Sequence, residues 1–361
     1  TSCKKIRARA ELAISCGKIY ASMAKSSMKK ISLIVTVLNE EQTIIPLLES
    51  IFLQSHLPQE IIITDGDSSD ETVALLTECV QEIAQFSTIK KFKKLAQATQ
   101  IVVAKGNRSV GRNRAINLAQ YELIAITDAG CILETDWLQE LYLKYTQTGA
   151  KVIAGYYSGV AHTSLQKAII PYVLVMPDKV DEANFLPATR SMLIEKKLFE
   201  EMGGFDETLS DNEDYAFAKK LEKEQKKRKA NKEIFMSFAQ KALVYWTPRT
   251  TLSQFYTMIF RFARGDVYAK IIRPKVVLVF ARYVVFLYTF IFALEVFKLL
   301  FLLYFVWAMQ KNKKYVGSAW VYLPTLQVIS DFAVIFGSVA GGFALLRGFF
   351  ERFFGRDSSQ N

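Results

Sequence analysis

The sequence of 361 residues has few of the side chains that usually hold zinc. It contains four cysteines and two histidines, namely Cys3, Cys16, Cys79, Cys131, His56 and His162. No two cysteines have Cys-x-x-Cys spacing, which most zinc sites share. The sequence therefore argues against a zinc site. It also does not require the oxidising compartment in which disulfide-rich proteins fold.

A repeat of fixed period and a secretory signal are also missing from the sequence. Residues 1–27 are basic and weakly apolar, without the long apolar stretch of a cleavable signal. Because Met28 directly precedes the first strand pattern, we expect residues 1–27 to be an extension, either disordered or added by the assigned start of translation.

The formal net charge of +11 would attract nucleic acid, anionic lipid or phosphorylated substrates. Cations gather in residues 90–94 and 219–232 and beside the apolar C-terminal part of the chain. They lack the interleaved aromatic side chains on which single-stranded nucleic acid stacks. We therefore expect no nucleic-acid partner and favour a membrane surface, with a simple solvated face as the alternative for residues 219–232.

Short β-branched runs alternate with helical patterns in the first part of the chain. We expect strands at 31–37, 60–64, 100–104, 123–127, 151–157 and 191–194, and helices at 43–52, 71–86, 107–120 and 213–221. This alternation predicts an α/β fold with a mostly parallel sheet and helices on both faces. Such sheets bind ligands at the carboxyl ends of their strands, where Asn39, Asp65 and Asp128 fall.

Apolar residues dominate the C-terminal part. Residues 276–309 and 320–346 are almost entirely apolar, and roughly 20 apolar residues cross a bilayer. We therefore predict transmembrane helices over 274–350, two in number, or three if the first stretch crosses twice. Glu295 and Lys298 are spaced to neutralise each other on one helix face. The alternative is a pair of helices buried in a soluble domain.

Four acidic residues, in three places along the chain, are candidates for chemistry. Asp65 follows a buried strand, where a sheet presents ligand contacts. Asp128 follows another, and a carboxylate there can reach a divalent cation that neutralises a diphosphate. Glu213 and Asp214 open a helix whose dipole keeps them ionised, so one could accept a proton as a general base. The structural alternatives are a turn at Asp128 with Gly130 and stabilisation of the helix start.

Six motifs occur in a characteristic order. They are Val37-Leu38-Asn39-Glu40-Glu41, Asp65-Gly66-Asp67-Ser68-Ser69-Asp70-Glu71-Thr72, Gly111-Arg112-Asn113-Arg114-Ala115, Asp128-Ala129-Gly130-Cys131, Gly203-Gly204-Phe205-Asp206-Glu207 and Glu213-Asp214-Tyr215. With these motifs the chain resembles family 2 glycosyltransferases, inverting enzymes with a GT-A fold, over about residues 30–265.

The resemblance implies a nucleotide diphosphate sugar as donor and a role for each motif. The implied nucleotide-sugar residues are Asn39, Glu40, Asp65, Asp67, Arg112 and Asp128, and the implied catalytic residues are Asp214 and Glu213. Asp214 would be the base, and Asp128 would approach ribose, diphosphate and a divalent cation, Mn²⁺ or Mg²⁺. Gly130 replaces the second acid of the family's Asp-x-Asp motif, which weakens the expected metal contact.

The segment before the apolar part also bears on function. Processive members of the family would carry Gln-x-x-Arg-Trp near the membrane entry, and neither the Gln nor the Trp is present in Met258–Gly265. We therefore favour transfer of a single sugar. Arg261 and Arg264 are expected to contact a diphosphate or a lipid phosphate from an interfacial helix over 251–273. An ordinary packed amphipathic helix is the alternative.

Together these observations predict a GT-A domain over 28–250, the interfacial helix, transmembrane helices and a polar tail at 351–361. The expected function is inverting transfer of a sugar to a lipid-linked or saccharide acceptor by an enzyme of the plasma membrane with a cytosolic catalytic domain. The alternative is a non-catalytic membrane scaffold that retains a sugar-nucleotide fold.

Overall fold

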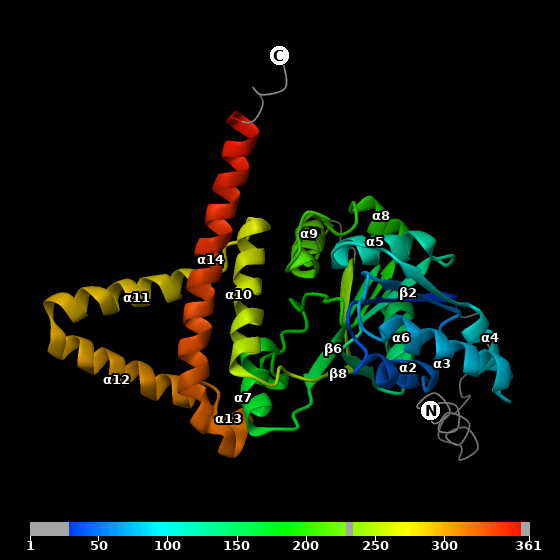
Figure 1. Ribbon diagram of the computed structural model, residues 1–361, viewed down its shortest axis with the longest axis horizontal. Helices are drawn as coiled ribbons and strands as arrows, with labels where there is room; N and C mark the ends of the chain where they lie inside the picture. Colours follow the sequence, from blue (N-terminus) through cyan, green and yellow to red (C-terminus); the bar gives the residue numbers. More distant parts are fainter. Residues whose placement is uncertain (1–28, 229–233, 355–361) are drawn as a thin grey trace. The chain divides into compact units, whose positions relative to one another are not determined.

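The computed structural model describes residues 29–228 and 234–354 (Figure 1). The predicted extension at 1–27 and most of the predicted tail at 351–361 lie outside these residues. The chain divides into two compact units. The first comprises Thr1–Ser158, Met176–Thr208 and Phe217–Trp246, and the second comprises Gly159–Val175, Leu209–Ala216 and Thr247–Asn361. The second unit thus takes in two segments that the sequence placed inside a continuous 28–250 domain.

The first unit is built on an eight-stranded sheet with the order β3-β2-β1-β4-β7-β6-β8-β5. The strands are β1 (Ile31–Val37), β2 (Glu60–Asp65), β3 (Thr99–Val103), β4 (Leu123–Asp128), β5 (Cys131–Leu133), β6 (Val152–Gly159), β7 (Met192–Glu195) and β8 (Met236–Trp246). The four strands β3, β2, β1 and β4 pair in parallel. The pairs β4–β7, β6–β7 and β5–β8 are antiparallel.

The sheet is therefore mixed rather than mostly parallel as expected. Parallel pairing needs a crossover connection, usually a helix packed on the sheet. The helix between β6 and β7 is α7 (Ser164–Val173), which belongs to the second unit. The connection from β6 to β7 leads to an antiparallel pair instead of the expected parallel one.

Helices cover both faces of this sheet (Figure 1). The helices of the first unit are α2 (Ile44–Phe52), α3 (Thr72–Phe86), α4 (Lys90–Gln97), α5 (Arg108–Leu118), α6 (Trp137–Thr148), α8 (Lys196–Glu201), most of α9 (Glu213–Arg228) and the 3₁₀ turn η1 (Pro177–Lys179). Ala115 of α5, Phe199 of α8 and Phe217 of α9 share one core with Ile34 and Ile126 of the sheet. That core fixes α5 against the strands that end in Asp65 and Asp128.

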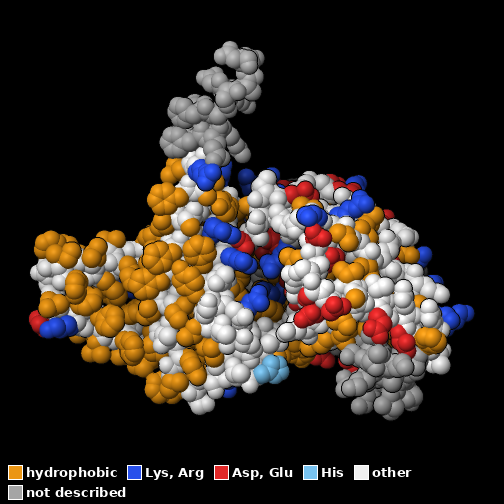
Figure 2. All heavy atoms as spheres, in the orientation of Figure 1, with side chains coloured by type: hydrophobic (Ala, Val, Ile, Leu, Met, Phe, Trp, Pro, Cys, Tyr) orange, Lys and Arg blue, Asp and Glu red, His pale blue; other side chains and the backbone are white. Residues whose placement is uncertain are grey.

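The second unit is helical. Besides α7 it contains α10 (Leu252–Tyr268), α11 (Pro274–Phe292), α12 (Leu294–Lys311), α13 (Lys313–Val316), the 3₁₀ turn η3 (Gly317–Tyr322) and α14 (Leu323–Phe354). Two helical stretches are long and apolar enough to cross a membrane, Pro274–Phe292 and Lys313–Arg347, with 6% and 22% of their apolar windows buried. Figure 2 shows hydrophobic side chains over the visible surface of α11 and α12. So little burial is unlike the core helix of a soluble protein.

Helices α10 and α14 pack closely along each other. Small residues make this approach possible, because a Cβ added at Gly337 would lie 2.4 Å from the carbonyl oxygen of Phe260, and one at Gly341 would lie 2.8 Å from Cβ of Val267. Glycines spaced four apart on a helix let two backbones come together in this way. Phe255 and Ile259 of α10 are buried in the unit, as the packed-helix alternative requires.

A buried polar cluster joins α11, α12 and α14. The carboxylate of Asp331 is 2% exposed and accepts hydrogen bonds from Arg282 Nη2 at 2.5 Å and Tyr304 Oη at 2.6 Å. Gln327 donates to its other oxygen at 2.9 Å. The carboxylate is thus paired, as a buried charge must be. Glu295 and Lys298 form the predicted pair, at 2.7 Å.

Candidate active site

Strand register brings the predicted ligand residues to one edge of the sheet in the first unit. Asp65 lies opposite Val37 on the neighbouring strand, and Asp128 lies opposite Thr36. The loop after β1, which carries Asn39, therefore starts between the two acidic strand ends. Because β7 runs antiparallel to β4, the residues just before it lie at the same edge.

The Asp65 side chain organises the loop that follows β2. It is 2% exposed. Its Oδ2 accepts from the backbone N–H groups of Asp67 at 3.1 Å and Ser68 at 3.0 Å, and its Oδ1 accepts from the Ser68 hydroxyl at 2.5 Å. These bonds form an Asx turn of the kind that aspartate favours. Asp67 has a left-handed backbone, with φ of 79°, and pairs at 2.8 Å with Lys105.

The loop after β1 is bonded to the same turn. Asn39, with φ of 54°, accepts from the backbone N–H of Ser69 at 2.9 Å and donates its own N–H to the Ser68 hydroxyl at 2.8 Å. The N–H of Glu40 donates to the Thr72 hydroxyl at 2.7 Å. Thr43, at the N-cap position of α2, makes no side-chain cap bond, because its hydroxyl donates instead to the Glu40 carboxylate. The loops after β1 and β2, which are predicted to bind the nucleoside, are therefore joined by hydrogen bonds.

The Gly111-Arg112 motif places a buried cation beside Asp128. A Cβ on Gly111 would lie 3.1 Å from Thr36 Cγ2 and 3.2 Å from Thr64 Oγ1, so glycine lets α5 approach the sheet. The Arg112 side chain, 3% exposed, then pairs through Nη2 with Asp128 Oδ1 at 2.8 Å. The Asp128 side chain is 29% exposed. One of its faces is thus paired with arginine while part of the carboxylate reaches solvent.

Further arginines surround this carboxylate. Burial would raise the pKa of Asp128, but the charges of Arg112, Arg190 and Arg108 outweigh burial and hold the pKa below its ordinary value. The Thr189 hydroxyl lies 3.4 Å from Asp128 Oδ2. Sequence reasoning missed Arg190 and Thr189, since they follow a stretch with no readable periodicity. The antiparallel start of β7 is what brings them to Asp128.

Two of the sequence motifs contact each other. The side chain of Asn113, next to Arg112, donates to the Phe205 carbonyl at 2.9 Å and accepts from its N–H at 3.0 Å. The preceding Gly203 and Gly204 have φ of 76° and 64°, a left-handed turn that glycine favours. Arg112 lies over the Phe205 ring at 5.6 Å. The glycine-rich motif therefore supports the helix that carries Arg112.

The fit of a divalent cation can be judged from the donors near Asp128. No cluster of three or more His, Cys, Asp or Glu side chains able to hold a metal occurs in residues 29–228 and 234–354. Asp128 offers the single carboxylate of its motif, since Gly130 has no side chain. Mg²⁺ is often bound by one or two carboxylates with substrate phosphates and water. The residues therefore fit a cation that arrives with a diphosphate, not one held by the protein alone.

The predicted catalytic pair lies in the second unit, at the start of α9. The Glu213 side chain is 2% exposed, whereas Asp214 is half-buried. Asp214 is thus the more accessible of the two carboxylates. In the same unit Arg264 pairs with Asp211 at 2.6 Å, and Arg261 is exposed. A protein carboxylate therefore already contacts Arg264, one of the two predicted phosphate ligands.

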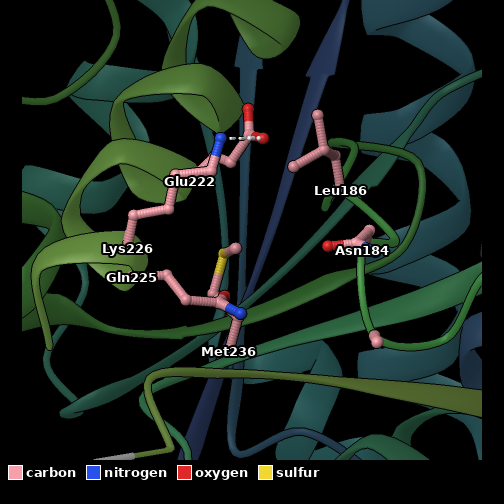
Figure 3. Close-up of a pocket in the computed structure, with 7 residues that line it drawn as sticks. Asn184, Leu186, Glu222, Gln225, Lys226 and Met236 are labelled. Atoms are coloured by element: carbon pink, nitrogen blue, oxygen red, sulfur yellow. Dashed lines mark hydrogen bonds and ion pairs between the residues drawn. The ribbon is translucent and has the colours of Figure 1, made fainter. Parts of the chain in front are cut away.

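Two cavities of the first unit are lined by none of the predicted site residues. One, of about 40 Å³, is lined by residues of α9, β8 and the segment before β7, including Asn184, Glu222 and Met236 (Figure 3). One water occupies about 30 Å³, so a sugar nucleotide cannot enter. Another, of about 350 Å³, adjoins Lys29 and Leu123, where β1 and β4 begin. That edge is opposite the one that carries Asp128.

Comparisons with known proteins agree on the kind of domain. Residues 32–170 match the model of Glycosyl transferase family 2. Poly(ribitol-phosphate) beta-N-acetylglucosaminyltransferase TarP of Staphylococcus aureus is 27% identical over 132 residues, which are 36% of this chain and 37% of TarP. Beta-monoglucosyldiacylglycerol synthase of Trichormus variabilis is 30% identical over 122 residues, 33% of this chain and 24% of that enzyme.

Among solved structures, S. aureus TarS 1–349 in complex with UDP aligns with a TM-score of 0.43 and 19% identity, covering 66% of this chain and 65% of that one. The sequence alignments reach 37% or less of the length of either curated relative. The matched residues run from the second residue of β1 past the end of β6, and they include the Arg112–Asp128 pair. Residues 32–170 of this chain therefore form a glycosyltransferase family 2 domain.

Proposed function

We propose that the chain is an inverting glycosyltransferase that takes a sugar from a nucleotide diphosphate sugar. The observation that carries this proposal is the Arg112–Asp128 pair at the carboxyl edge of the sheet, inside the matched domain. In this role, the loops of Asn39, Glu40, Asp65 and Asp67 hold the nucleoside. Asp128 faces the ribose and the diphosphate, and Arg112 and Arg190 bring positive charge to the same place.

The diphosphate that leaves carries negative charge, which must be stabilised as the bond to the sugar breaks. Arg112 is held in place by burial, so its charge is already oriented. Asp128 would hold a divalent cation, Mn²⁺ or Mg²⁺, and the cation would supply Lewis-acid stabilisation of the leaving diphosphate.

Asp214 is proposed as the base that takes the proton of an acceptor hydroxyl, with Glu213 beside it. Support comes from its place in the first turn of α9, where its side chain is half-buried and more accessible than that of Glu213. A phosphate acceptor would need no base, because its oxygen is already ionised. Replacing Asp214 by Asn should then lower transfer to a hydroxyl acceptor and spare transfer to polyprenyl phosphate.

The acceptor is proposed to be lipid-linked or a saccharide presented at a membrane that the C-terminal helices enter. The apolar, exposed surfaces of Pro274–Phe292 and Lys313–Arg347 support a membrane partner. The relatives' names include a poly(ribitol phosphate) transferase and a glucosyldiacylglycerol synthase, so both kinds of acceptor merit a test. We further propose a plasma-membrane location with the first unit in the cytosol, and transfer of one sugar per cycle.

The test is a thermal-shift screen of purified protein against uridine, guanosine and thymidine diphosphate sugars, with and without Mn²⁺. One donor class should raise the melting temperature, and Asp128→Asn should reduce that shift. A non-catalytic scaffold is the second candidate, favoured by Gly130 in place of the second acid. It predicts nucleotide binding without turnover of any donor, a result that would count against the enzyme.

A further inference from the structure

An ion pair with a buried carboxylate contacts the segment that carries the candidate base, entirely within the second unit. Asp266 of α10 is 5% exposed. Its carboxylate accepts two hydrogen bonds from Arg273, from Nε at 2.6 Å and from Nη2 at 2.8 Å. The same carboxylate accepts from the side-chain amide of Asn212 at 3.0 Å. Asp266 therefore connects the residue directly before Glu213 to Arg273.

Arg273 also reaches the residue on the other side of the candidate base. Its guanidinium group lies over the Tyr215 ring, 3.9 Å from the ring centroid. Planar guanidinium groups favour such stacking and two-point pairing with a carboxylate, whereas lysine cannot provide both. The Asp266–Arg273 pair thus holds Asn212 and Tyr215, which flank Glu213 and Asp214 in the sequence.

The backbone of this segment needs such support. Asn212 has φ of 59°, in the left-handed region that non-glycine residues rarely adopt. Its amide also donates to the Phe262 carbonyl at 2.6 Å. A Cβ on Gly265 would lie 2.6 Å from the carbonyl oxygen of Asp211, so α10 touches the segment's backbone directly. Uncommon conformations of this kind persist where the surroundings determine them.

Arg273 occupies a particular place in the chain, as the N-cap of α11. Helix α11 is the first candidate membrane span. The residue that enters this span is therefore the one that contacts both Asp266 and Tyr215. A displacement of the start of α11 would be transmitted to the segment of Asp214 through the Arg273 side chain.

We propose that Asp266 and Arg273 are positioning residues for the candidate base Asp214, and that they link its placement to the start of the first candidate membrane span. The proposal rests on the proposed role of Asp214. Because the Arg273 side chain is 37% exposed, its pair with Asp266 is screened by solvent and adds little net stability. A pair that joins Asn212 and Tyr215 instead sets the orientation of the acids between them, and misplacement of a reacting group by 1 Å can cost about 100-fold in rate.

The test measures transfer by the full chain in nanodiscs, with UDP-glucose and UDP-N-acetylglucosamine as donors and diacylglycerol in the same bilayer as hydroxyl acceptor. Asp266→Asn and Arg273→Ala should lower kcat about 10- to 100-fold. Donor affinity should change less than twofold. Arg273→Lys, which keeps the charge, should recover part of kcat. Lys275→Ala, which removes an exposed charge two residues away, should match the unmodified chain.

Combining these variants with Asp214→Asn tests separately the positioning role of Asp266 and Arg273 and the proposed role of Asp214 as base. If the pair acts through Asp214, Asp266→Asn should have little further effect on kcat in the Asp214→Asn chain. Full independent losses in the double variant, or unchanged kcat in Asp266→Asn and Arg273→Ala, would overturn the positioning role. Unchanged kcat in Asp214→Asn alone would instead reject the proposed base. The melting temperature of each variant shows whether it is folded. If Arg273→Ala is unfolded, kcat is measured with the conservative variant Arg273→Lys instead.

Discussion

The carboxylate of Asp128 is accompanied by guanidinium groups and not by a second carboxylate. Arg112 pairs with it at 2.8 Å, and Gly130 stands at the second acidic position. Because its pKa is lowered, Asp128 stays ionised at any pH above its ordinary value of 3.8. Its contribution to stability is lost only as the pH falls below that value through the folded pKa. Donor binding near neutral pH should therefore not titrate with this group.

Gly130→Asp should strengthen binding of Mn²⁺. A Cβ at this position meets nothing within 4 Å, and the backbone is not left-handed, so an aspartate can be accommodated. A second carboxylate adds an oxygen ligand and offsets the surrounding positive charge. Calorimetric titration with Mn²⁺ in the presence of UDP should show at least a tenfold gain in affinity, about 1.4 kcal/mol. Gly130→Asn, equal in size but neutral, is the control. Equal affinity in both variants would contradict this account of the site.

Cys131 should be unreactive in the folded protein. Burial and the charge of Asp128 together raise the pKa of this thiol to about 12. The thiolate is the reactive form, so at pH 8 almost none is present. Iodoacetamide should modify Cys131 only after urea is added. Mass spectrometry of the peptide that contains Cys131 measures the extent of modification. Rapid modification without urea would show that β5 is more open than described.

At the scale of the elements, sequence patterns predicted helices and strands best where a whole strand or one face of a helix is buried. Strand β1 begins and ends as predicted, since nearly every residue in Ile31–Val37 is buried. Helix α4 was not predicted, because four of its eight residues are lysines and Phe92, Leu95 and Ala96 alone are buried. The contact of Asn113 with Phe205 joins residues 92 apart in sequence. Periodicity carries no information about such pairs.

The glycines of α14 provide a test of helix packing within the second unit. Gly337→Ala should destabilise the unit by about 1 to 3 kcal/mol, since the added methyl group would overlap the Phe260 carbonyl of α10. Gly342→Ala is the matched control, because its Cβ meets nothing within 4 Å. It should stabilise the helix by up to about 1 kcal/mol. Thermal unfolding in detergent measures both, and similar shifts would contradict the described packing.

The cluster around Asp331 offers a second test of the same unit. Asp331→Leu leaves Arg282 without its carboxylate, and breaking a buried pair typically costs about 3 to 5 kcal/mol. The partial exposure of Arg282, 23%, should reduce that cost. The double variant Arg282→Met/Asp331→Leu should recover much of the loss, measured by the same unfolding assay. A double variant as unstable as Asp331→Leu would exclude the ion pair as the cause.

At the scale of the whole molecule, the sequence identified the kind of domain and the order of its motifs. It did not identify the division into units, because Gly159–Val175 and Leu209–Ala216 join the second unit through contacts distant in sequence. Asn212, for example, bonds to Asp266, 54 residues away. The candidate base therefore belongs to the same unit as the candidate membrane helices. This arrangement is why the predicted consequences of Asp266 and Arg273 variants concern turnover and not donor binding.

The central claim is that the chain transfers sugar from a nucleotide diphosphate donor, and one measurement tests it directly. Purified full-length protein in nanodiscs is supplied with radiolabelled UDP-sugars and hydroxyl acceptors, and labelled product is counted beside Asp128→Asn and Asp214→Asn. We predict product with one donor and at least a 100-fold lower rate in both variants. Donor binding without product from any donor and acceptor pair, or full activity in both variants, would contradict the account.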